Sequence, residues 1–135
     1  MGLLQGELLA ADKPEWSAQL SAEITEQRWL ALARALIVAG QPAAENPLDP
    51  DMPPGREEGI SEVVAAKLDA LGFSVELVSK RAGRPNVIGT LLGARPEGPT
   101  LILNDHLDTY PAGDPESWTK TGGDPFRPTR DGDFL

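Results

Sequence analysis

The spacing of apolar residues changes at Gly72, and this change strongly restricts the fold. Before Gly72 the apolar residues recur at helical spacing on one face: Ile60, Val63, Val64, Leu68 and Leu71. After it, Phe73, Val75 and Leu77 alternate with polar residues, as in a β-strand. A glycine at this position is typical of a helix C-terminus. A helix that passes directly into a strand predicts an α/β fold.

A second helical pattern lies upstream, and its N-cap is predicted at Asp12. Its apolar stripe is expected to face the core and contains Trp16, Leu20, Ile24, Trp29, Leu30, Ala33, Leu36 and Ile37. Gly40 and Pro42 end the pattern. The stripe fits either one long helix or two helices broken near Ser21. The proline-rich residues 41–55 predict an irregular loop within one domain.

Two further strands are predicted downstream of the first. Residues 86–92 form one, and residues 100–103 (TLIL) form a short, fully apolar strand. Such a strand is expected to lie centrally in a sheet that is covered on both faces. The predicted architecture is therefore two helices followed by a mixed β-sheet, with the third strand leading into the candidate site.

The charge and residue content exclude several classes of function. A net charge of −9 disfavours nucleic acid and anionic membranes as partners. The chain has no cysteine, so a metal site would have to use His, Asp and Glu. The sequence contains no secretory signal and no run of roughly 20 apolar residues, so a cytoplasmic location is expected.

His106 is the only histidine, and it follows the apolar residues 100–103 with Asp108 two positions later. Zinc binds neutral imidazole, and a ligating histidine usually donates its other ring N–H to a carboxylate. His106 is therefore a candidate metal ligand that Asp108 would orient from behind. The triplet alone also fits a loop histidine beside a solvated acid.

The surroundings of this triplet carry a more specific signal. Residues 98–113 (GPTLILNDHLDTYPAG) resemble the metal-binding strand and loop of the ArgE/DapE/carboxypeptidase G family of zinc metallopeptidases and deacylases. The family's later Trp, Asp-Pro-Phe and Asp-Gly elements have counterparts at Trp118, residues 124–126 and residues 131–132, and residues 84–89 (RPNVIG) match an upstream strand. The resemblance covers about residues 22–135. Asp105 departs from the pattern, because the family usually has glycine there, and it is expected to be solvated.

The resemblance implies a hydrolase of amide bonds in N-acyl amino acids or small peptides. It implies that His106 ligates one of two zinc ions, for which cobalt or manganese could substitute, and that Asp108 is the catalytic-motif acid that orients His106. Residues 1–21 would be an N-terminal extension or helix start, and residues 22–135 a partial catalytic domain.

The family's remaining metal ligands and its lid domain would lie beyond Leu135, so the 135-residue chain is expected to be inactive alone. A homodimer is expected only with that lid domain. The alternative is a non-catalytic truncated remnant without a functional metal site.

Structural roles are predicted for the other conspicuous side chains. Trp118 and Phe126 are expected to anchor loops. Glu57 and Glu58 are interpreted as favourable charges at a helix N-terminus. Arg81 and Arg84 are expected to be solvated in a turn.

Overall fold

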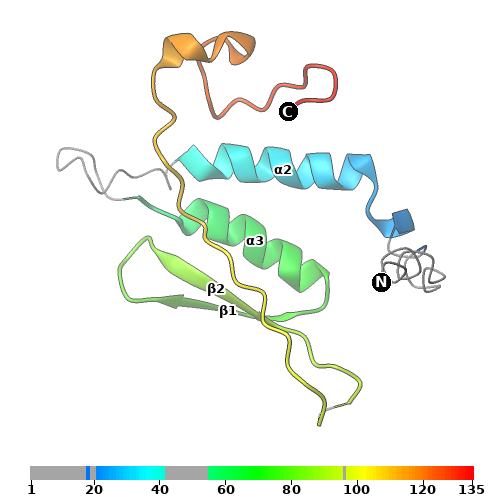
Figure 1. Cartoon of the computed structure of the whole chain (residues 1–135). Coiled ribbons are helices and arrows are strands. Elements are labelled where there is room, and N and C mark those ends of the chain that lie inside the picture. The colour runs from blue at the N-terminus through cyan, green and yellow to red at the C-terminus, as the bar shows by residue number, and fades with distance from the viewer. Residues whose placement is uncertain (1–17, 19–20, 42–54, 96) are drawn as a thin grey trace, which may run out of the picture. The chain divides into compact units, whose positions relative to one another are not determined.

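The computed structural model describes residues 18, 21–41, 55–95 and 97–135 (Figure 1). The predicted N-cap at Asp12, the stripe residues Trp16 and Leu20, and most of the proline-rich segment lie outside these ranges. The chain divides into two compact units, Met1–Ala33 and Arg34–Leu135. The candidate site and all the strands described below belong to the second unit.

Helix α2 spans Glu26–Gly40. Residues 21–23 are also helical, and residues 24 and 25 separate them from α2, so the helical pattern is broken into two, slightly after the expected position. Thr25 starts α2, because its carbonyl and hydroxyl oxygens both accept from the Arg28 amide, at 3.0 and 3.3 Å. Leu30 is buried as predicted, but Trp29 is 48% exposed and is not a core residue.

Helix α3 spans Glu58–Ala70 and ends as its sequence predicts. Gly72 adopts a φ of +86°, in the left-handed region that glycine tolerates. The Gly72 amide donates to the Asp69 carbonyl at 2.8 Å, and the Phe73 amide donates to the Leu68 carbonyl at 3.1 Å. This pair of bonds is the Schellman arrangement, which satisfies carbonyls left open at the helix end. It turns the chain directly into the first strand.

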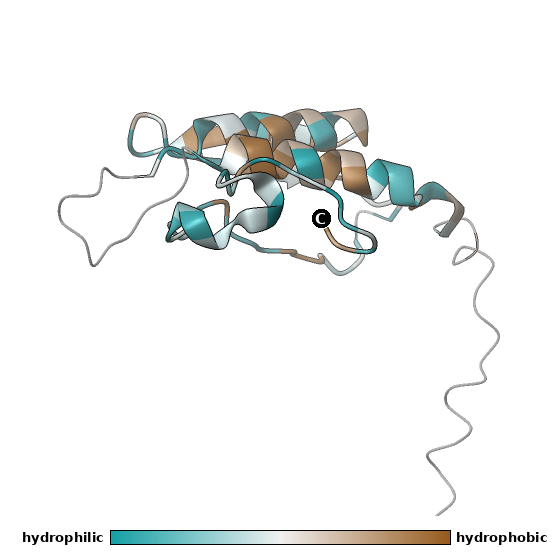
Figure 2. Ribbon diagram, turned by 90° about the horizontal axis from the view of Figure 1, so that it is seen from above, coloured by the Kyte–Doolittle hydropathy of each residue, from teal (hydrophilic) through white to brown (hydrophobic). Residues whose placement is uncertain are grey.

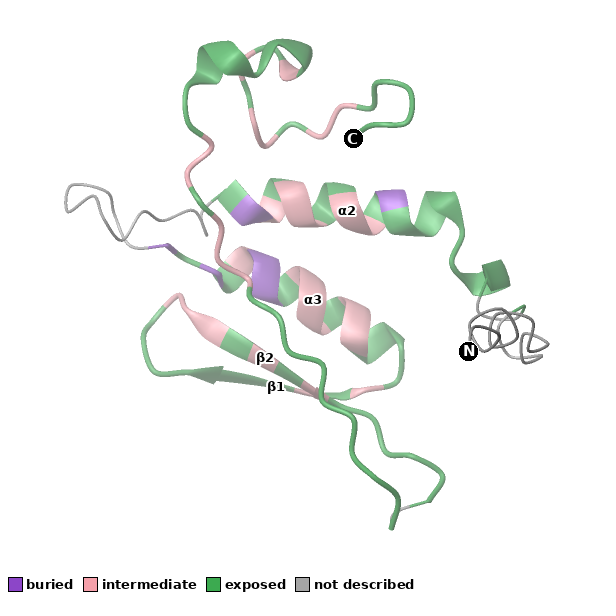
Figure 3. Ribbon diagram, in the orientation of Figure 1, coloured by how far each residue is buried: buried purple, intermediate pink, exposed green. Residues whose placement is uncertain are grey.

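Strands β1, Ser74–Ser79, and β2, Pro85–Thr90, form an antiparallel hairpin with Ser74 opposite Thr90 and Ser79 opposite Pro85. Helix α3 packs against both strands. The helix approaches β2 closely at Gly89, where an added Cβ would lie 2.9 Å from Cδ1 of Leu68. Ile60 of α3 is buried, and the inward positions of β2 are half-buried (Figure 3). The α/β class predicted from the sequence is confirmed.

The predicted third strand is not formed. Residues 100–103 belong to no strand, and Leu101, Ile102 and Leu103 are 82%, 80% and 88% exposed. The described residues contain a two-stranded sheet only, so the prediction of a mixed sheet with a buried central strand was wrong. The physical reason is that a strand needs backbone partners on its edges, and no described segment pairs with this one.

The helices are amphipathic rather than uniformly apolar. Figure 2 shows hydrophobic and hydrophilic residues alternating around α2 and α3. Within the described ranges, no helix has the length and hydrophobicity needed to cross a membrane.

Candidate functional site

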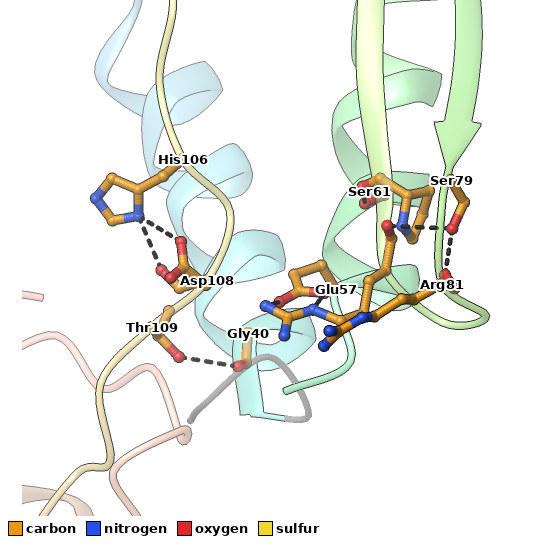
Figure 4. A network of polar contacts seen from close by, with 10 residues as sticks. Gly40, Glu57, Ser61, Ser79, Arg81, His106, Asp108 and Thr109 are labelled. Carbon is orange, nitrogen blue, oxygen red and sulfur yellow. Dashed lines mark hydrogen bonds and ion pairs between the residues drawn. The ribbon is translucent and has the colours of Figure 1, made fainter. Parts of the chain in front are cut away.

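The candidate site lies on an extended segment that passes the C-terminal end of α2 (Figure 4). Thr109 fixes this segment, because its hydroxyl Oγ1 donates to the Gly40 carbonyl oxygen at 3.3 Å. Gly40 is buried, and a Cβ there would lie 3.8 Å from Cγ2 of Thr109 and 4.0 Å from Cδ1 of Ile60. Thr109 is thus joined to the helix end through its hydroxyl group.

His106 and Asp108 are brought together as the sequence predicted (Figure 4). Nδ1 of His106 lies 2.9 Å from the Asp108 carbonyl oxygen and 3.1 Å from the Asp108 carboxylate Oδ1. A carbonyl oxygen can only accept, so Nδ1 carries the proton and donates. In the neutral ring the lone pair then resides on Nε2, at the opposite edge. The side chain of His106 is 78% exposed, so Nε2 is accessible to a ligand.

Two neighbouring aspartates, Asp108 and Asp105, raise the pKa of the His106 imidazole. The pKa of His106 is raised above its ordinary value of 6.5, first by the hydrogen bond to the Asp108 carbonyl and then by the negative charge of Asp108. The charge of Asp105 adds a smaller effect in the same direction. The Asp105 carboxylate is held near His106, because its Oδ1 accepts from the His106 backbone amide at 2.8 Å.

A buried polar cluster at the start of α3 was not predicted. Glu57 has 7% of its side chain exposed and forms two bonds with Arg84: Nε to Oε2 at 3.0 Å and Nη2 to Oε1 at 2.7 Å. Ser61 is fully buried and donates to the Pro85 carbonyl at 3.1 Å. The interpretation of Arg84 as a solvated turn residue was therefore wrong. The available signal in the sequence was an acidic residue, Glu57, directly before α3 and a basic residue, Arg84, directly before β2.

The segment after the site is tied together by local hydrogen bonds. The indole Nε1 of Trp118 donates to the Ala112 carbonyl at 2.9 Å, and the Phe126 amide donates to the Asp124 carboxylate at 2.9 Å. These bonds flank two 3-10 turns, η2 at Pro115–Ser117 and η3 at Thr119–Thr121. Trp118 thus anchors its loop, as expected.

Among the described residues, the side chains around His106 provide one metal ligand and not a complete metal site. No group of three or more His, Cys, Asp or Glu side chains that could hold a metal occurs in the described part of the chain. A catalytic zinc usually has three protein ligands. His106 fits one of these positions, because its Nδ1 is held by an oxygen acceptor and its Nε2 faces outward.

The chain is similar to two curated enzymes. It is 34% identical over 119 residues to the N-formyl-4-amino-5-aminomethyl-2-methylpyrimidine deformylase of Bacillus subtilis, a match that covers 87% of this chain and 25% of the relative. It is 32% identical over 75 residues to the succinyl-diaminopimelate desuccinylase of Leptothrix cholodnii, covering 54% of this chain and 19% of that protein. The chain therefore spans a quarter or less of the length of these relatives.

Two other comparisons gave no match. No protein-family profile matches the sequence, and no solved structure matches the chain. Both similar enzymes are named for removing an acyl group, formyl in one and succinyl in the other, which makes the chain distantly similar to deacylating hydrolases.

Proposed function

We propose that this chain supplies one part of a zinc-dependent hydrolase that cleaves the amide bond of small N-acyl compounds. The observation that carries the proposal is the orientation of His106. Its Nδ1–H is held by Asp108, and its Nε2 lone pair faces solvent, which is how a protein presents a histidine to a metal. The similarity to two deacylating enzymes supports amide hydrolysis as the reaction class.

In this proposal His106 ligates a zinc ion through Nε2, and Asp108 fixes the tautomer and direction of the ring. Zinc in such a site polarises the scissile carbonyl and activates a water molecule. Cobalt and manganese are expected to substitute. The other ligands and the general base come from residues outside the described set, because His106 has no cluster of further donors around it there. As part of this proposal, the chain alone is expected to be inactive.

The substrate class follows from what the two relatives share. One is named for a formyl group and the other for a succinyl group, each removed from a small molecule. We therefore propose an N-acyl amino acid, small peptide or similar N-acyl amine as substrate, and neither nucleic acid nor membrane as partner. The net charge of −9 agrees with that exclusion. A cytoplasmic location, and a homodimer that depends on a further domain, are parts of the same proposal.

A segment exchange tests the proposal. The residues of the Bacillus subtilis deformylase that align with this chain are replaced by the chain, and zinc content and hydrolysis of N-formyl, N-acetyl and N-succinyl substrates are measured. We expect zinc-dependent turnover that His106→Ala abolishes and Asp108→Asn reduces by about 10- to 100-fold. The control is Lys120→Ala, which removes an exposed ion pair with Asp131 and should leave turnover unchanged.

The non-catalytic alternative makes the opposite prediction, and the observation that favours it is that the residues described by the structure hold no cluster of metal donors. A folded exchange protein that binds less zinc than the native deformylase and hydrolyses none of these substrates would support that alternative. The 135-residue chain alone provides a second test. Turnover by the chain that is lost in His106→Ala would refute the idea that its site is incomplete.

A further inference from the structure

Thr109 connects the His106–Asp108 pair to the end of α2 through a hydrogen bond within the second unit. The residues from 101 to 106 are exposed, and Thr109 is half-buried. Its hydroxyl donates to the carbonyl oxygen of Gly40, the last residue of α2. Carbonyls in the last turn of a helix have no partner within the helix, so this acceptor is available to a side chain from elsewhere.

The hydrogen bond of Thr109 restricts the side chain of this residue. The hydroxyl bond to the Gly40 carbonyl is 3.3 Å long, and its acceptor belongs to a buried residue at the helix end. A β-branched side chain has few χ1 rotamers, so this bond also limits the movement of the Thr109 backbone.

The backbone of Thr109 determines where the acceptor for His106 lies. The Asp108 carbonyl oxygen accepts from Nδ1 of His106 at 2.9 Å. That oxygen belongs to the peptide unit between Asp108 and Thr109, whose six atoms from one Cα to the next are coplanar. Rotation of this plane would swing the oxygen away from Nδ1. Fixing Thr109 therefore holds the acceptor in place.

We propose that Thr109 is a positioning residue that selects the Nδ1–H tautomer of His106 by holding the Asp108–Thr109 peptide plane against the end of α2. The metal-binding consequence, an Nε2 lone pair presented to zinc, rests on the proposed function. The tautomer itself does not, because it is a property of the chain without metal.

The test uses the 135-residue chain, in which His106 is the only histidine and gives an unambiguous signal. Imidazole ¹⁵N resonances are recorded without metal, at a pH well above the pKa of the ring, where the two neutral tautomers have distinct shifts. We expect wild-type His106 to be mainly Nδ1–H. Thr109→Val keeps the shape and loses the hydroxyl, so both resonances should move toward their common average. Thr109→Ser keeps the hydroxyl and should restore the wild-type shifts.

The matched control is Thr129→Val, because Thr129 is also half-buried and its hydroxyl donates to the Arg127 carbonyl at 3.2 Å. It should leave the His106 resonances unchanged, whatever its effect on the melting temperature. The proposal is overturned if wild-type His106 is mainly Nε2–H, or if folded Thr109→Val keeps the wild-type shifts. It also fails if Thr109→Ser and Thr109→Val shift equally. The segment exchange described above tests the proposed function separately.

Discussion

The bond between Glu57 and Arg84 predicts a large loss of stability when either side chain is removed. Glu57 has 7% of its side chain exposed and Arg84 has 26%, so water screens the pair weakly. Two parallel charge-assisted bonds, at 3.0 and 2.7 Å, connect them. Removing one partner of a buried pair costs about 3–5 kcal/mol. Because Arg84 retains some solvent contact, the lower limit applies, and Glu57→Ala should cost about 3 kcal/mol.

The assay is thermal and urea unfolding of the 135-residue chain. A change of about 3 kcal/mol corresponds to a melting temperature lowered by roughly 10 °C in a protein of this size. The neighbouring pair Arg56–Glu58 is the matched control, because it joins the same two residue types at 3.1 Å but leaves 69% and 56% of the side chains exposed. Glu58→Ala should cost less than about 1 kcal/mol.

A double-mutant cycle separates the pair from its surroundings. In Glu57→Ala/Arg84→Ala the combined loss should be clearly smaller than the sum of the single losses, because the second removal leaves no unpaired buried charge behind. Equal losses in Glu57→Ala and Glu58→Ala, or additive losses across the cycle, would refute the argument that burial of the Glu57–Arg84 pair sets its contribution.

Three further predictions concern the site, a helix end and the exposed apolar segment. In an NMR titration His106 should have a pKa above 6.5, and Asp108→Asn should lower this pKa. Protonation of His106 stabilises the fold at acidic pH, and this effect is lost as the pH rises through the pKa. The proposed zinc binding should strengthen over the same pH range. Gly72→Ala should cost about 1–2 kcal/mol in urea unfolding because φ is +86°, whereas Gly93→Ala, also without neighbours around the added Cβ, should be nearly neutral. Ile102→Thr should reduce aggregation in light scattering without lowering the melting temperature, since Ile102 is 80% exposed; a clear drop in melting temperature would mean that the segment is packed.

The parts of the fold that were predictable from the sequence are those determined by neighbouring residues. The helical face of α3, its end at Gly72 and the presence of strand β1 each depend on residues a few positions apart, and all three are present. The Glu57–Arg84 pair was missed because its partners are 27 positions apart and meet only when the hairpin packs on α3. The apolar residues 100–103 predicted a strand, but strand formation also requires a partner that composition does not reveal.

The difference between contacts of neighbouring residues and contacts of residues far apart in the sequence also explains why only part of the candidate site could be predicted. Asp108 is two residues from His106, so one short segment suffices to orient the ring, and the predicted contact is present at 3.1 Å. The link from Thr109 to Gly40 spans 69 positions and left no pattern in the sequence. A complete zinc site has the same non-local character, because its ligands come from separate segments that folding brings together. His106 can therefore be oriented within this chain before any metal binds, whereas the zinc binding that we propose would depend on ligands that the described residues do not provide.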